Sequence, residues 1–396
     1  MTADVVKQRI QSIDILRGLV MVIMALDHVR DFFHITAMTQ DPLAVEITTP
    51  QLFFTRWITH FCAPTFVFLS GLSAALAAKY KPRKEAAIFL MKRGLWLIIV
   101  EIVVITLGMT FNPLYNAIIL QVIWATGWSM LILGFLIRFF PDKLILFLGV
   151  IIVAGHNLFD SMTVPSTGVG PVLLQVFVTV KFLIIPYGEN RGIGVMYAIL
   201  PWAGVMMLGY SMAKWYIHDN AEKRKKKLMI AGMTLIGLFI LLRWINVYGD
   251  PRPYSEKTTV FKTFLSFLNT NKYPPSLLYL CMTIGPSILL LSFWENTSNR
   301  VASFFKVYGK VPFFYYVLHF YLIHIILVVV FFATGYGAKD IVTPNVPFLF
   351  RPVQFGFNLP VVYLIWLSVV LILYKPCVWY GRYKDSHKDK WWLHYL

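Results

Sequence analysis

The chain has 396 residues, of which 58% are hydrophobic and only 14% charged, and its mean hydropathy is +0.66. Soluble domains carry about 25% charged residues, so this composition is typical of an integral membrane protein embedded in a lipid bilayer. The net charge of +17 would suit nucleic-acid binding, but the basic residues form short clusters between apolar stretches. Such clusters orient membrane helices, and we exclude nucleic acid as a partner.

Apolar stretches of about 20 residues, the length that crosses a bilayer core, recur along the chain. They predict an all-α fold, a polytopic transmembrane helix bundle of about ten spans forming a single domain over residues 1–396. The first stretch lacks an A-x-A cleavage site, which indicates a retained helix and not a signal peptide. The predicted spans are 13–33, 56–78, 92–111, 115–137, 143–158, 194–216, 228–248, 274–294, 311–334 and 358–380.

Basic residues are unevenly distributed over the connections between these spans. The connections on one side carry 24 of the 36 Lys and Arg residues, and the run Lys223–Lys227 is the densest cluster. Because cytoplasmic segments are enriched in Lys and Arg, we expect both termini to be cytoplasmic. The predicted cytoplasmic segments are the N-terminus, 79–93, 138–143, 214–227, 300–310 and the C-terminus from residue 375.

One further apolar stretch, 172–187, is short, contains Lys181 and is bracketed by Pro171 and Pro186. If it crossed the membrane, every later basic cluster would lie outside, so we predict a re-entrant or outer-surface segment. The outer connections are long and irregular, which favours a polar substrate handled from that face. Long outer loops without such a role are an alternative of equal weight.

Polar residues inside a membrane span are costly to bury, so each is a candidate functional residue. Arg17 and His28 are eleven residues apart, which places both on one face of the first helix with a rise of about 16 Å between them. Asp27 and Asp31 flank His28, and a carboxylate on one ring nitrogen would make the other nitrogen more basic. The pattern predicts a cation near the cytoplasm and a base near the outer face.

Structural roles are the alternative for these two residues. Arg17 would pair with Asp14 or with Glu101 of the third span, and His28 would be a hydrogen-bonded residue where the helix meets the interface. The shared helix face and the flanking carboxylates together favour the functional interpretation.

The ninth predicted span contains a second polar cluster. Tyr316 and His319 are i, i+3 neighbours on a helix. Aromatic residues at a membrane edge usually form an interfacial belt, which does not explain a histidine deep inside the span. His34 and His60 lie at the outer ends of the first two spans. The spacing of these histidines matches no standard ligand pattern, and we predict no metal site.

Four segments resemble, in this order along the chain, the heparan-α-glucosaminide N-acetyltransferase-like family of bacterial membrane proteins. The spacing from Arg17 to His28 also resembles the R-x10-H signature of membrane-bound acyltransferases. Small residues in two of these segments, among them Gly71, and Gly209 further along the sixth span, predict close packing between helices. The four segments are SIDILRG at 12–18, PTFVFLSG at 64–71, LPWAGV at 200–205 and YGKVPFFYYVLH at 308–319.

The resemblance implies an acyltransferase that moves an acyl group from cytoplasmic acyl-CoA to a sugar or glycan acceptor on the outer side. Acetyl-CoA is the expected co-substrate, and the bacterial inner (plasma) membrane the expected location. The family's catalytic histidine follows the first span, and both His28 and His34 fit that position. A homo-oligomer is compatible with the sequence.

The polar residues suit this chemistry. A histidine can act as general base for an acceptor hydroxyl or amine, and Tyr316 or His319 can donate a hydrogen bond to the developing oxyanion. Arg17, Lys92 and Arg93 are the candidate cations for the phosphates of the donor. A transporter or flippase for a polar or lipid-linked sugar is the alternative function, because it would use the same residues without an acyl donor.

Overall fold

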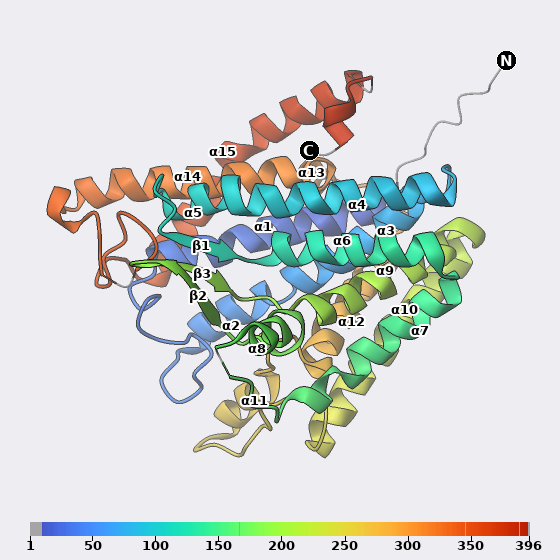
Figure 1. Cartoon of the computed structure of the whole chain (residues 1–396), viewed down its shortest axis with the longest axis horizontal. Coiled ribbons are helices and arrows are strands. Elements are labelled where there is room, and N and C mark those ends of the chain that lie inside the picture. Colours follow the sequence, from blue (N-terminus) through green and yellow to red (C-terminus); the bar gives the residue numbers. More distant parts are fainter. Residues whose placement is uncertain (1–9, 166, 345, 388, 395–396) are drawn as a thin grey trace.

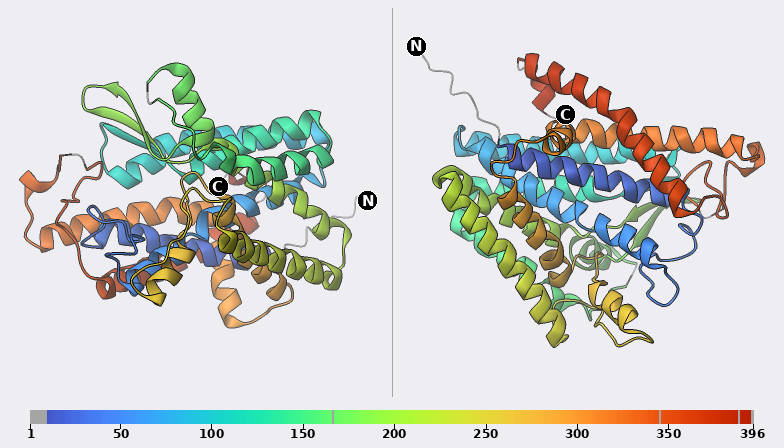
Figure 2. Two further views of the ribbon diagram at one scale, coloured as in Figure 1. Left: turned by 90° about the horizontal axis from the view of Figure 1, so that it is seen from below. Right: turned by 180° about the vertical axis from the view of Figure 1, so that it is seen from behind.

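The computed structural model describes residues 10–165, 167–344, 346–387 and 389–394, and the predicted cytoplasmic N-terminal segment before residue 10 lies outside them. The described chain is mostly helical and forms one bundle (Figure 1). Helix α1 is central to the bundle, because it packs against α2, α3, α12, α13, α14 and α15. Helix α15 lies diagonally across α1 and α14 on one face of the bundle (Figure 2).

Each predicted span overlaps one of the long helices. These are α1 (Gln11–Phe33), α3 (Cys62–Ala78), α4 (Arg83–Val100), α6 (Val122–Phe139), α7 (Asp142–Gly155), α9 (Ile199–His218), α10 (Ala221–Ile245), α12 (Leu277–Phe293), α14 (Pro312–Ala333) and α15 (Leu359–Ser386). The short helices are α2 (Pro50–Thr59), α5 (Thr106–Thr110), α8 (Val169–Leu174), α11 (Val260–Leu268) and α13 (Arg300–Lys310).

Within the described residues, 6 helical segments are long and apolar enough to cross a bilayer, so the chain is a helical membrane protein. They are Pro50–Ala78, Val122–Phe139, Asp142–Phe159, Ala221–Ile245, Pro312–Ala333 and Leu359–Ser386. The other four predicted spans coincide with α1, α4, α9 and α12. Helix α12 has only 17 residues, and the charged residues of α1 lower its hydropathy.

The prediction of an all-α fold needs one correction, because three short strands form a small sheet. Strand β1 (Ala117–Leu120) lies parallel to β3 (Arg191–Val195), which pairs antiparallel with β2 (Leu183–Gly188). Ile and Val residues in these strands favour extended backbone. The predicted span 115–137 therefore begins as a strand and becomes helical only at α6.

The apolar segment 172–187 is built from short elements. Helix α8 continues as a π-helical turn at Gln175–Thr179, and the chain then enters β2. The apolar helix Val169–Thr179 is about 16 Å long at 1.5 Å per residue, roughly half the thickness of a bilayer core. It is too short to cross as a single helix.

Two short helices were not predicted from the sequence. Helix α11 lies in a predicted outer connection, and α13 occupies the predicted cytoplasmic segment 300–310. Each begins at a polar capping residue: the side chain of Thr259 accepts a hydrogen bond from Lys262 N, and that of Asn299 accepts one from Ala302 N. These caps are the sequence signals that could have located both helices.

Glycines allow the backbones of two helix pairs to approach closely. A Cβ atom on Gly71 of α3 or on Gly209 of α9 would overlap a backbone oxygen of the facing helix, which confirms the predicted close packing. Gly18 of α1 and Gly309 of α13 form a second crossing of the same kind, where a Cβ on Gly309 would overlap the carbonyl oxygen of Asp14. This crossing holds the start of α1 against the junction of α13 and α14.

Gly309→Ala should lower the melting temperature of the purified protein in detergent, because overpacking at a tight contact costs about 1–3 kcal/mol of unfolding free energy. Gly237→Ala in α10 is the matched control, since no atom lies within 4 Å of the added Cβ. Alanine is favoured over glycine inside a helix by about 0.5–1 kcal/mol, so the control should melt at the wild-type temperature or above it. Equal melting temperatures for both variants would contradict the close crossing.

Candidate functional site

Two cavities lie along α1, each with a volume of about 220 Å³. Arg17 lines one of them and His28 the other, and we call them the Arg17 cavity and the His28 cavity. Phe66 of α3 contributes to the lining of both, so the two cavities approach each other at this residue. Arg17 and His28 were predicted to share one face of α1, and each of them lines one of these two neighbouring cavities.

The Arg17 cavity is strongly basic. No acidic side chain is among the described residues that line it, so its potential is positive and suits an anionic ligand. Its cations come from helices and turns that are distant in the sequence. They are Arg17 of α1, Lys81 of the α3–α4 turn, Arg93 of α4, Lys310 at the end of α13 and Lys384 of α15.

Arg17 has structural partners as well as a place in the cavity wall. Its guanidinium donates hydrogen bonds to Asp14 Oδ1 at 3.3 Å, to the carbonyl of Gly309 at 3.3 Å and to Ser73 Oγ at 2.6 Å. Glu101, the other partner considered from the sequence, instead accepts a hydrogen bond from a backbone N–H at the start of α6 at 2.8 Å. Arg17 is therefore held in a fixed position while it faces the cavity.

Lys92 and Arg93 are adjacent in α4 but face different directions. Arg93 lines the Arg17 cavity, whereas Lys92 is exposed and is not part of the lining. Successive helical residues point about 100° apart, so only one of the two can face a given cavity. Of these two predicted cations, only Arg93 is placed to meet a ligand in this cavity. Lys81, Lys310 and Lys384 were missed, because only the packing of separate helices brings them together.

The His28 cavity brings together four of the six predicted catalytic residues. His28, Asp27, Asp31 and Tyr316 all line it. Its remaining polar residues come from four further parts of the chain and from α1 itself. They are Arg30, Arg56, Thr59, Gln121, Tyr197, Lys272 and Tyr273.

The two carboxylates do not orient His28, contrary to the expectation from the sequence. Asp27 accepts hydrogen bonds from Arg56 Nη1 at 2.6 and 2.5 Å and from Arg30 Nη2 at 3.0 Å. Arg30 also donates to Asp31 at 2.7 Å. Asp27 and Asp31 therefore hold two arginines at the cavity wall, and their proximity to His28 in the sequence concealed this role.

The imidazole of His28 packs against α14. Its ring centroid lies 5.2 Å from that of His319 and 4.4 Å from that of Phe320. Within the described part of the chain, no side chain or backbone group forms a hydrogen bond with the His28 ring. Because the side chain lines the cavity, its ring nitrogens are available to a ligand there.

His319 lies behind His28 and does not line the cavity. Its Nδ1 is 2.5 Å from the carbonyl oxygen of Tyr316 and 3.2 Å from that of Tyr315, and since a carbonyl only accepts, Nδ1 carries the proton. Among the described residues, neither His319 Nε2 nor the hydroxyl of Tyr316 has a hydrogen-bond partner. Both groups predicted to donate to an oxyanion thus lie close to His28, and only Tyr316 reaches the cavity wall.

His34 occupies a different place. It follows the last residue of α1, and its Nδ1 contacts Thr36 Oγ1 at 3.0 Å and accepts a hydrogen bond from Thr36 N at 3.3 Å. Burial lowers the pKa of His34, and the positive charges of Arg30 and Arg351 add to this effect. His34 does not line the His28 cavity. The geometry therefore separates the two candidate histidines and favours His28.

His60 and His324 lie in different surroundings. His60 packs against Tyr279 with ring centroids 5.3 Å apart, and among the described residues neither of its ring nitrogens has a hydrogen-bond partner. The ring of His324 lies between the carbonyls of Met109 and Leu349, at 3.0 Å from each. Within the described residues, no group of three or more His, Cys, Asp or Glu side chains is placed to hold a metal ion.

Comparison with known proteins adds one finding to this geometry. The family model described as heparan-alpha-glucosaminide N-acetyltransferase, catalytic, matches residues 9–245, which is more than half of the chain. The matched range contains Arg17, His28, Arg56, Phe66 and Arg93. A search of curated proteins found no match.

Proposed function

Since the chain belongs to the heparan-α-glucosaminide N-acetyltransferase catalytic family, we propose that it transfers an acetyl group from cytoplasmic acetyl-CoA to a sugar or glycan on the outer side of a bacterial inner membrane. One observation carries this proposal. A basic cavity and a cavity containing an imidazole lie in succession along one face of α1 and share Phe66 in their linings. A donor with charged phosphates and a polar acceptor would each find a suitable environment.

The Arg17 cavity is the proposed donor site. The phosphates of acetyl-CoA are polyanionic, and arginine binds phosphate oxygens through paired, charge-assisted hydrogen bonds. Arg17 and Arg93 would hold these phosphates, with Lys310 adding positive charge from the α13–α14 junction. The acyl end of the donor would then extend past Phe66 toward His28.

The His28 cavity is the proposed acceptor site. His28 would take the proton from the acceptor hydroxyl or amine as its oxygen or nitrogen attacks the thioester carbonyl. The new C–O or C–N bond forms first and gives a tetrahedral oxyanion, whose collapse breaks the C–S bond, and the CoA thiolate leaves and receives the proton from His28. The hydroxyl of Tyr316 would donate a hydrogen bond to the oxyanion formed in between.

The proposed membrane arrangement has ten spans, both termini in the cytoplasm and the 172–187 segment on the outer side, within a single domain. The linings of the two cavities support it. Lys81, Lys310 and Lys384 of the Arg17 cavity come from predicted cytoplasmic segments. Lys272 and Tyr273 of the His28 cavity lie at the end of a predicted outer connection. Donor and acceptor would thus approach from opposite sides.

Sealed proteoliposomes with the protein in one orientation test the proposal. We expect acetyl-labelled acetyl-CoA, supplied only on the side of the Arg17 cavity, to label at least one member of a panel of neutral, amino and acidic sugars held on the other side. Label should remain in CoA when donor and acceptor are exchanged. Absence of labelled sugar in either arrangement would contradict the proposal. Passage of unmodified sugar without any donor would favour a transporter.

A further inference from the structure

One cation in the His28 cavity has no acidic partner. Lys272 lines the cavity, and only 8% of the residue is exposed. Its ammonium group lies over aromatic rings, 5.1 Å from the ring centroid of Tyr273 and 6.0 Å from that of Tyr197. Among the described residues, no carboxylate lies within the 4.0 Å that defines an ion pair with Lys272.

The other charges of this cavity compensate one another. Asp27 pairs with Arg56, and Asp31 pairs with Arg30. Lys272 is the positive charge that remains. A buried charge is costly unless a charged or hydrogen-bonding partner compensates it, and one phenol hydroxyl, that of Tyr273, together with two phenol rings compensates an ammonium only in part. The cavity is therefore prepared for a ligand that brings a negative charge.

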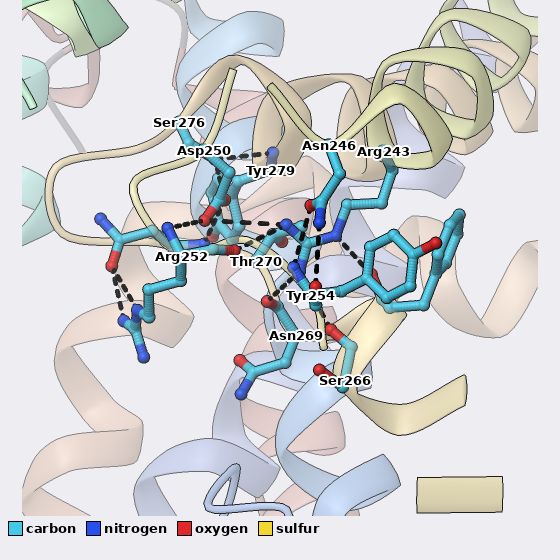
Figure 3. Close-up of polar contacts among 12 residues, drawn as sticks. Arg243, Asn246, Asp250, Arg252, Tyr254, Ser266, Asn269, Thr270, Ser276 and Tyr279 are labelled. Atoms are coloured by element: carbon cyan, nitrogen blue, oxygen red, sulfur yellow. Dashed lines mark hydrogen bonds and ion pairs between the residues drawn. The ribbon is translucent and has the colours of Figure 1, made fainter. Parts of the chain in front are cut away.

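A polar network that includes Asp250, Arg252 and Ser276 reaches residues close to Lys272 in the sequence (Figure 3). Asp250 accepts hydrogen bonds from the backbone N–H of Asn271 at 2.8 Å and from Ser276 Oγ at 2.6 Å. The side chain of Arg252 donates to Asn271 Oδ1 at 3.1 Å. These contacts fix Asn271, which precedes Lys272, and Ser276, which caps α12, so the backbone that carries Lys272 is held in place.

Arg243 extends the same network into α11. It is 1% exposed, and its guanidinium donates to the backbone carbonyls of Phe267, Ser266 and Asn269 at 2.9, 3.0 and 2.9 Å. The end of α11 and the segment that follows are thus tied to α10. Because the segment that carries Lys272 is tied to α10, it loses little conformational freedom when a ligand binds, and this favours tight and selective recognition.

We propose that the acceptor is an anionic sugar, whose carboxylate or phosphate pairs with Lys272 while a hydroxyl or amine of the same sugar faces His28. The inference rests on the proposed function in one respect, namely that the ligand of the His28 cavity is the acetyl acceptor. Tyr197 and Tyr273 supply flat aromatic faces and hydroxyl groups beside the ammonium, which suits a sugar ring with a charged substituent.

Calorimetric titration of the full-length protein in detergent with three sugars tests the proposal. Methyl glucuronoside and glucose 1-phosphate carry a carboxylate and a phosphate, and methyl glucoside is the neutral counterpart. The wild type should bind at least one anionic sugar roughly 10-fold to 100-fold more tightly than the neutral one, as expected for a buried charge pair. The stronger of the two anionic ligands identifies the group.

Two variants of Lys272 and one control complete the test. Lys272→Gln should abolish the preference for the anionic sugar, and Lys272→Arg should retain most of it. Lys262→Gln should keep the wild-type preference, because Lys262 belongs to the same outer connection but pairs with Glu46 at the surface, at 3.7 Å. The wild-type comparison and Lys272→Arg remain decisive if Lys272→Gln does not fold.

Equal wild-type affinities for anionic and neutral sugars, or an unchanged preference in Lys272→Gln, would overturn the inference. The acetyl-transfer assay separates this outcome from failure of the proposed function. Acetylation of neutral and anionic sugars at equal rates would refute the role of Lys272 and retain the enzyme. Selective binding of anionic sugars without any acetyl transfer would retain the role of Lys272 and refute the enzyme.

Discussion

His28→Ala should reduce acetyl transfer by about 10²-fold to 10⁴-fold, the usual cost of removing a general base, and leave the affinity for acetyl-CoA unchanged. His28 lines the proposed acceptor cavity, and among the described residues no group forms a hydrogen bond with its ring. The donor phosphates, in contrast, are assigned to the other cavity. Initial rates and donor affinity, measured on the purified protein in detergent with insertion confirmed, give the two readouts.

His34→Ala is the matched control, because it removes an imidazole one and a half helical turns further along without changing the cavity lining. It should retain near-normal turnover. Normal turnover of His28→Ala together with loss of turnover in His34→Ala would assign the base to His34. Normal turnover in both variants would remove the histidine mechanism.

Arg17→Ala should weaken the affinity for CoA by roughly 10-fold to 100-fold, because one hydrogen-bonded charge pair contributes about 1.5–3 kcal/mol. Arg17 also bonds Asp14, Gly309 and Ser73, so some loss of stability is expected as well. Pantetheine, which has no phosphates, separates the two effects. Its affinity should change little in the variant.

Lys92→Ala provides the control for the removal of a basic residue. Lys92 is exposed and does not line the Arg17 cavity, so CoA affinity should stay at the wild-type value. If Arg17→Ala binds CoA as well as the wild type does, Arg17 serves only as a partner of Asp14 and Ser73, and the donor site must lie elsewhere.

The long helices could be predicted because a bilayer requires an apolar stretch of nearly constant length. The shorter elements depend on local signals that hydropathy does not contain. Helices α11 and α13 begin at Thr259 and Asn299, whose side chains cap backbone N–H groups. The three-stranded sheet depends on contacts between β1 and β3, which are more than 70 residues apart in the sequence.

The site was predictable only where a single helix determines it. Arg17 and His28 share a face of α1, and helical geometry alone establishes that relation. Arg56 and Lys272 reach the His28 cavity through the packing of α2 and of the segment before α12, which no periodicity describes. One feature of the sequence could have indicated both residues. Lys and Arg are usually enriched on the cytoplasmic side, whereas these two cations lie at the outer ends of predicted spans.

Phe66 has a consequence for the integrity of the membrane. A catalyst that joins a cytoplasmic donor to an external acceptor creates a route along which ions and water could leak. Phe66, which lines both cavities, contributes a hydrocarbon surface where they approach each other, and hydrophobic constrictions resist wetting. In the proposed reaction only the narrow thioester end of the donor must pass this point, while its phosphates stay in the Arg17 cavity. The protein would thus transfer an acetyl group across the bilayer without dissipating the ion gradients that the cell maintains there.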